Sequence, residues 1–186
     1  MITDEKTRTR LLVYASLAAA FRYPDDNFYA LFPDEWAGAE RLIESYDDLF
    51  RRKEIWLLCV EYTAENEFQR VQQLADINGF YRAFGVHVDQ ERSDAISCEL
   101  EFMHYLIFKM ETAPDEEKRQ LCLQAQRDFF LVHLYPAATK LCVKVLATEK
   151  DTFYGRACQS LLDFFEEEKS RFEAMQPAAT LDATLV

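Results

Sequence analysis

Apolar residues recur at helical spacing over most of this chain. The clearest case begins after Asp94, where four apolar residues fall at i, i+4, i+7 and i+11 and therefore share one helical face: Ile96, Leu100, Met103 and Ile107. Three further apolar residues widen this stripe: Phe102, Leu106 and Met110. The pattern predicts a central helix that is buried on more than one side.

The first half of the chain predicts several shorter elements. Leu11, Ala15, Ala18 and Arg22 mark one face of a first helix, which stops at Pro24-Asp25. Helical pieces are expected at 26–31 and 34–46, an apolar segment at 55–62, and a longer helix at 67–84 with Gly85 as its left-handed C-cap.

The second half predicts three more helices. Pro114 opens one of them, with acidic residues in its first turn, where the helix dipole favours them. Its predicted core positions are Cys122, Ala125, Phe129 and Val132. Pro136 is expected to end this helix and start another, and Thr152 to cap the last one.

No stretch of the chain shows the alternation typical of strands, and there is no internal repeat. We therefore predict an all-α fold with a single globular domain of about seven to nine helices over residues 1–176. The tail 177–186 has no clear pattern and is expected to be frayed. The widest loops are expected at 85–93 and 111–115.

The charge balance narrows the classes of partner. The 186 residues carry 33 acids against 21 Lys and Arg, a net charge of −12, and 49% of them are hydrophobic. A folded domain is expected, and its acidic surface argues against nucleic acid, because a phosphate-binding face needs clustered basic residues. A basic partner fits this charge better.

The cysteines and apolar runs indicate a compartment. Five cysteines occur without a Cys-x-x-Cys pair, which predicts free, buried thiols and a cytoplasmic location: Cys59, Cys98, Cys122, Cys142 and Cys158. The apolar stretch 11–21 follows basic residues as in an export signal, but Asp4 and Glu5 favour an ordinary amphipathic helix. No apolar run reaches the length of a membrane span, so no membrane insertion is expected.

Motifs for catalysis or metal binding are weak. Glu101 and His104 have the spacing found in di-iron helical bundles, but the second motif that such a site requires is missing. There is no nucleophile elbow and no phosphate-binding glycine loop. We expect a protein without enzymatic activity, metal or cofactor. A helical metal-dependent enzyme remains the less favoured alternative.

One region combines acids with aromatic residues. Glu91, Asp94, Glu99 and Glu101 lie close in sequence and follow the aromatic residues of 80–84. At helical spacing Glu101 shares a face with Ser97 and Tyr105, whereas Glu99 points elsewhere. The alternative interpretation is that Asp94 caps the helix and that the glutamates are merely solvated.

These segments resemble the TorD/DmsD/NarJ family of redox-enzyme maturation chaperones, which serve molybdoenzymes. The resemblance rests on Tyr-Arg-Ala-Phe-Gly at 81–85, Glu-Arg-x-Asp at 91–94 and Glu-Leu-Glu-Phe-Met at 99–103, with Glu-Tyr-Thr at 61–63 upstream. Ala95 stands where many members have histidine, so the partner can differ from those of the best-known members.

The resemblance implies a cytoplasmic chaperone, monomeric or dimeric, that binds an apo molybdoenzyme catalytic subunit, its twin-arginine leader peptide or both. It would assist insertion of the molybdenum cofactor and delay export until assembly is complete. Carboxylates suit the paired guanidinium groups of such a leader. The expected contact residues are Asp94, Glu99, Glu61, Tyr62, Tyr81, Glu91, Arg92 and Glu101. A generic acidic helical adaptor is the alternative.

Overall fold

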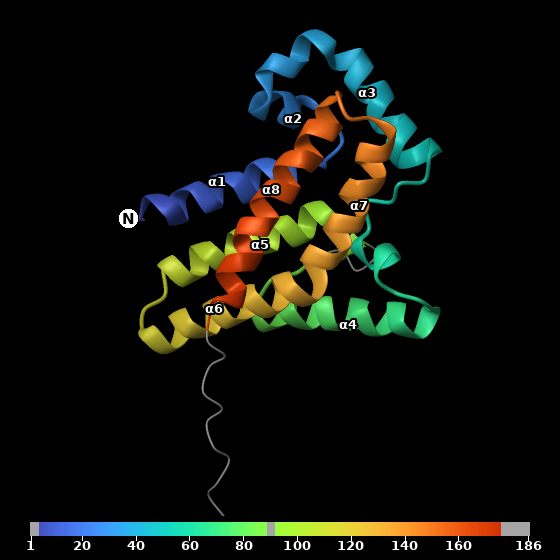
Figure 1. The fold of residues 1–186 in the computed structure, drawn as a ribbon. Helices are drawn as coiled ribbons and strands as arrows, with labels where there is room; N and C mark the ends of the chain where they lie inside the picture. Colours follow the sequence, from blue (N-terminus) through green and yellow to red (C-terminus); the bar gives the residue numbers. More distant parts are fainter. Residues whose placement is uncertain (1–3, 89–91, 176–186) are drawn as a thin grey trace, which may run out of the picture.

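The computed structural model describes residues 4–88 and 92–175, which are mostly helical (Figure 1). Eight α-helices follow one another in these ranges: α1 Glu5–Ala20, α2 Asp26–Leu31, α3 Ala39–Asp47, α4 Glu67–Ala83, α5 Ile96–Glu111, α6 Glu116–Phe129, α7 Tyr135–Thr148 and α8 Phe153–Glu173. The described residues include no β-strand, only an isolated bridge between Leu58 and Ala95. The predicted all-α globular fold is confirmed. The predicted tail 177–186 lies outside the described residues.

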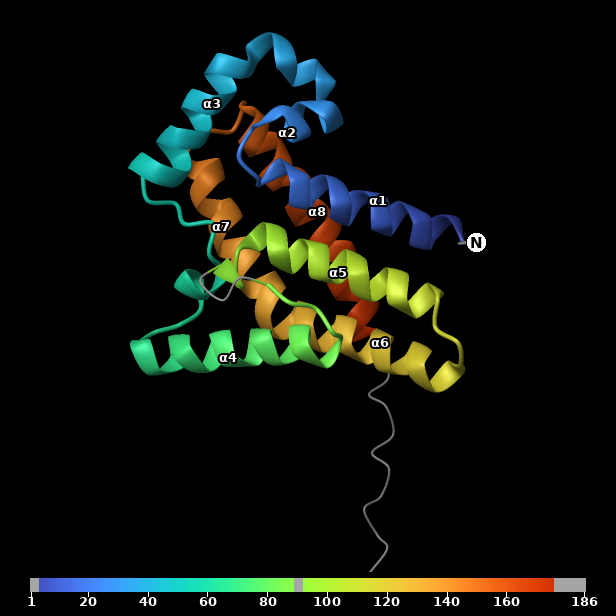
Figure 2. The same cartoon turned by 180° about the vertical axis from the view of Figure 1, so that it is seen from behind.

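Helix α5 forms the centre of the structure. It packs along α1 and along α6, and α7 packs against α8 (Figures 1 and 2). The predicted stripe is confirmed, because Ile96, Leu100, Met103 and Ile107 are all fully buried. The short helices α2 and α3 lie at one end of the molecule and α4 at the other (Figure 1).

Helix α1 is confirmed, but its buried face differs from the prediction. Leu11 and Ala18 are buried as expected, whereas Ala15 and Arg22 are exposed. The buried face instead includes Tyr14, because α1 contacts both α5 and α8 and must cover a wider angle than one stripe.

The predicted break at Pro136 is wrong. A π-type turn, Phe130–Leu134, joins α6 to α7, so the helix continues from Glu116 to Thr148. This wider turn tolerates a proline that would disrupt regular i to i−4 bonding. Val132 lies within this turn, whose wider winding departs from regular helical spacing, and it is 61% exposed although it was predicted to be in the core.

The continuous helix Glu116–Thr148 is the one described helix that is long and apolar enough to cross a membrane. This is weak evidence, because the core helix of a globular protein passes the same test. Half of its apolar stretch is buried inside the protein, where α6 packs on α5 and α7 on α8.

Several local predictions are confirmed. Gly85 has a φ of +72° just after α4, as a left-handed C-cap requires. The Thr152 hydroxyl accepts a hydrogen bond from the Gly155 amide at 3.2 Å and caps α8. All five cysteines are free, and four are buried; Cys98 is partly exposed.

Two helical glycines are expected to respond oppositely to alanine. A Cβ on Gly155 would overlap the carbonyl oxygens of Glu149 and Lys150, whereas one on Gly79 in α4 would meet nothing within 4 Å. We expect Gly155→Ala to destabilise the protein by about 1–3 kcal/mol. Gly79→Ala should stabilise it by about 0.5–1 kcal/mol, because alanine has less backbone freedom to lose. Urea unfolding of the two variants checks this, and shifts of the same sign would contradict it.

Candidate functional site

Two predicted segments that are far apart in sequence meet in the structure. The Cys59 amide donates to the Asp94 carbonyl at 2.8 Å, and the Ile96 amide donates to the Leu57 carbonyl at 2.9 Å. These bonds join the 3₁₀ turn Cys59–Tyr62 to the residues just before α5. The candidate site is built around this junction.

The side chain of Asp94 is buried inside the junction and stabilises it. Its side chain is 4% exposed, and its Oδ2 accepts a hydrogen bond from the Val60 amide at 3.2 Å. Burial raises the pKa of Asp94, although the Val60 bond opposes the shift. The alternative in which Asp94 caps α5 is wrong, since the N-cap is Ala95 and no side chain bonds there.

Glu99 lies inside the protein rather than on its surface. It is fully buried on α5, and neither carboxyl oxygen has a hydrogen-bond partner among the described residues. Burial raises the pKa of Glu99 well above its usual value, and the nearby charge of Asp94 adds to the shift. Burial and the charge of Glu99 raise the pKa of Cys59 in turn. Because Glu99 is fully buried, a bound peptide cannot reach it in this conformation.

Tyr81 is also buried and ties α4 to the start of α5. Its hydroxyl donates to the Ser93 carbonyl at 2.7 Å, and Asn78 on the same helix donates to the Ser93 hydroxyl at 3.1 Å. Only 1% of Tyr81 is exposed. Its ring packs edge-on against Phe102 of α5. The residue thus positions the junction.

Glu61 and Tyr62 lie on the 3₁₀ turn of the same junction. Glu61 forms an ion pair with Arg70 of α4 at 2.8 Å. The Tyr62 hydroxyl donates to the Trp56 carbonyl at 2.7 Å, and the Lys144 ammonium lies 4.9 Å from its ring centre. Both side chains are partly accessible, but their polar groups are engaged within the protein.

The remaining predicted residues lie toward solvent or outside the described ranges. Glu101 is exposed on α5 and forms an ion pair with Arg22, which follows α1. Arg92 is exposed, and its carbonyl accepts from the Ala95 amide at 3.1 Å. Glu91 lies outside the described residues. Ser97 and Tyr105 are partly exposed, so the predicted outward face of α5 is confirmed.

A groove of about 580 Å³ opens beside Glu101. It is mostly apolar and is lined by Tyr81, Val86, His87, Val88, Cys98, Glu101, Phe102 and Tyr105. Of these residues, only Tyr81 and Glu101 were predicted from the sequence as site residues. The apolar pair Val86 and Val88 in a predicted loop was the signal that could have revealed the rest, because loop residues are usually polar.

The predicted Glu101–His104 pair has other roles in the structure. Glu101 pairs with Arg22, and burial lowers the pKa of His104. Within residues 4–88 and 92–175, no three His, Cys, Asp or Glu side chains are close enough to hold a metal ion.

Comparison with known proteins places the fold and this junction in a family. The profile of the nitrate reductase delta subunit family matches residues 14–142. This match includes the C-terminal part of α1, both segments of the junction and the first half of α7. The chain belongs to this family. The predicted membership of the TorD/DmsD/NarJ chaperones is thereby confirmed, and this family consists of non-catalytic chaperones.

A curated relative agrees with the family. The chain is 30% identical over 167 residues to a protein of Dechloromonas aromatica (strain RCB) named "Perchlorate reductase assembly chaperone protein". The alignment covers 70% of this chain and 75% of the relative.

Proposed function

We propose that this delta-subunit family member is an assembly chaperone of a molybdoenzyme. It binds the apo catalytic subunit in the cytoplasm through the twin-arginine leader, the body of the subunit or both. Binding keeps the subunit open for insertion of the molybdenum cofactor and delays its export. Support comes from the family match and from the name of the Dechloromonas relative.

The observation that carries the leader part of the proposal is the arrangement at the rim of the groove. Glu101 presents a carboxylate there that is 45% exposed, next to an apolar surface formed by Val86, Val88 and Tyr105. A twin-arginine leader has the matching chemistry, with two guanidinium groups followed by an apolar segment. The guanidinium would bind the carboxylate and the apolar part would cover the groove.

Arg22 occupies this carboxylate in the free protein. A leader arginine would take its place, which exchanges one ion pair for another and favours modest, reversible binding. Asp94, Glu99 and Tyr81 act in this proposal by holding the junction behind the groove, since all three are buried. Glu61, Tyr62, Glu91 and Arg92 are proposed as further contacts around the junction.

Calorimetry with a synthetic twin-arginine leader tests this site. We expect Glu101→Gln to weaken binding about tenfold, as the loss of one charge-assisted hydrogen bond implies. Arg22→Gln should strengthen binding, because it frees Glu101. Added salt should weaken the wild-type interaction, since the acidic chain attracts a basic peptide at long range.

A leader with two lysines in place of the arginines is the matched control. Equal heat for both peptides would contradict recognition of guanidinium groups and would favour the generic acidic adaptor. Weaker binding by Arg22→Gln would show that Arg22 contacts the peptide rather than competing with it. Co-purification with an apo catalytic subunit, without any leader binding, would limit the proposal to the body of the subunit.

A further inference from the structure

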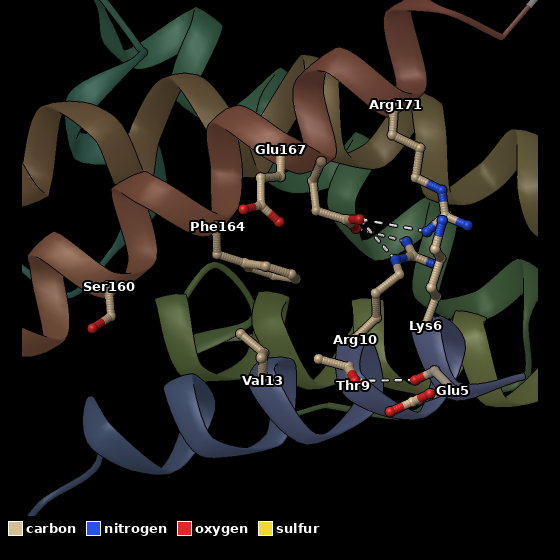
Figure 3. A pocket seen from close by; sticks show the side chains of 10 residues that line it. Glu5, Lys6, Thr9, Arg10, Val13, Ser160, Phe164, Glu167 and Arg171 are labelled. Carbon is tan, nitrogen blue, oxygen red and sulfur yellow. Dashed lines mark hydrogen bonds and ion pairs between the residues drawn. The ribbon is translucent and has the colours of Figure 1, made fainter.

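A second groove lies between the first half of α1 and the second half of α8, away from the junction. Its volume is about 900 Å³, and Figure 3 shows the side chains that line it. They are Glu5, Lys6, Thr9, Arg10, Val13, Ser160, Phe164, Glu167, Glu168 and Arg171. Arg22, which reaches Glu101, follows the opposite end of α1. Lys6 and Arg22 are separated by roughly 24 Å at the helical rise of about 1.5 Å per residue.

One end of this groove gathers cations around a single acid. Arg10 and Arg171 lie at this end of the groove with Lys6 beside them, whereas Phe164 and Val13 lie along the other part (Figure 3). Glu168 accepts from Arg10 Nε at 2.7 Å and from Arg10 Nη2 at 2.6 Å, and Arg171 lies 3.5 Å away. Two arginines therefore share one buried carboxylate, and Lys6 lines the groove beside them without an ion-pair partner of its own among the described residues.

Arg10 retains an unused donor in this arrangement. Its side chain is 7% exposed, and its Nη1 has no hydrogen-bond partner among the described residues. Its Nη2 also donates to the Gln126 side chain at 3.2 Å. A buried guanidinium nitrogen without an acceptor is unfavourable, so an added acceptor would be bound with a gain. A carboxylate matches the fork of the guanidinium best.

The rest of the groove limits what can bind. Glu5 and Glu167 line it together with the cations, so the six charged side chains sum to zero. These two acids would repel a polyphosphate. A single negative charge, in contrast, would be attracted by the local excess of positive charge at Lys6 and Arg171. Val13 and the ring of Phe164 offer apolar contact beside that charge.

We propose that the α1–α8 groove binds a segment of a partner protein in which an acidic residue is followed by apolar ones. The acidic side chain accepts hydrogen bonds from Arg10 Nη1 and from Lys6 or Arg171, and the apolar side chains cover Val13 and Phe164. This surface is distinct from the rim at Glu101, and it selects acidic rather than basic peptides.

Nuclear magnetic resonance of the full, isotope-labelled chain tests the proposal with defined probes. The peptide N-acetyl-Asp-Leu-Leu-amide should cause saturable shifts in the first half of α1 and the second half of α8. The matched peptide N-acetyl-Asn-Leu-Leu-amide should bind about tenfold more weakly, because it lacks the charge. Inorganic phosphate is the probe for a simple anion site. Phosphate shifts without a response to the aspartyl peptide would overturn the proposal.

Substitutions of exposed residues show which side chains bind the peptide, and they do not disturb the fold. Lys6→Gln and Arg171→Gln should each weaken binding of the aspartyl peptide about tenfold. Arg8→Gln makes the same charge change on the exposed side of α1, outside the groove, and should leave binding unchanged. Equal loss with Arg8→Gln would mean attraction by overall charge and would overturn the proposal. Leader binding at Glu101 should not respond to these variants, so each proposal can fail by itself.

Discussion

Replacing Glu99 with glutamine is expected to make the protein more stable than the wild type at pH 8, with no difference below pH 4.5. Burial raises the pKa of Glu99 well above its usual value of 4.5. The unfolded chain therefore loses this proton near pH 4.5, whereas the folded protein retains it until the raised pKa is reached. Between these two values the unfolded state binds fewer protons, so wild-type stability falls as the pH rises.

The free energy of unfolding falls by about 1.4 kcal/mol for each pH unit within that window. The fall ends at the pKa of Glu99 in the folded protein. Glutamine is uncharged at every pH and removes this contribution. Urea unfolding at pH 5, 6, 7 and 8 measures the difference, which should grow with pH until the raised pKa of the folded protein is reached. Asp94, whose pKa is also raised by burial, is present in both proteins and largely cancels.

Glu101→Gln is the matched control, because the same substitution two residues away removes an exposed carboxylate instead of a buried one. Its stability should follow the wild-type pH dependence. Parallel curves for Glu99→Gln and the wild type would contradict the assignment of Glu99 as a buried acid with a raised pKa.

Replacing Arg10 with methionine is expected to destabilise the protein by about 3–5 kcal/mol at pH 7. The substitution leaves Glu168 buried at 4% exposure, with Arg171 and the hydroxyl of Tyr14 as its remaining partners. An uncompensated buried charge is among the most unfavourable features that a single substitution can create. The measurement is the free energy of unfolding in urea.

A double variant separates the charge from the packing. Arg10→Met combined with Glu168→Leu should lose less stability than Arg10→Met alone, because no buried charge remains. Arg156→Gln is the exposed control: it removes an ion pair with Glu35 and should cost no more than about 1 kcal/mol. If Arg10→Met lowers the free energy of unfolding no more than this control does, the buried Arg10–Glu168 pair does not stabilise the protein as proposed.

The candidate site was only partly predictable. The motifs singled out the segments 61–63 and 91–103, and in the structure the turn Cys59–Tyr62 meets the residues just before α5 at the junction. The motifs could not distinguish Glu101 from Glu99. The side chain of Glu101 is 45% exposed, whereas Glu99, two residues earlier, is fully buried. That difference depends on which face of α5 meets its neighbours. Arg22 was missed because its contact with Glu101 spans 79 residues.

The sequence alone determined the helical class, most helix boundaries and the core stripe of α5. These features depend on local spacing and on caps such as Thr152, whose side chain accepts a hydrogen bond from the amide three residues later. The tertiary structure decided which faces of each helix are buried. Ala15, for example, is exposed although it lies on the predicted face of α1. It also decided that the helix continues past Pro136 and that Arg10, Gln126 and Glu168 share one buried network. Such outcomes depend on contacts between distant segments, and local periodicity contains no information about those partners.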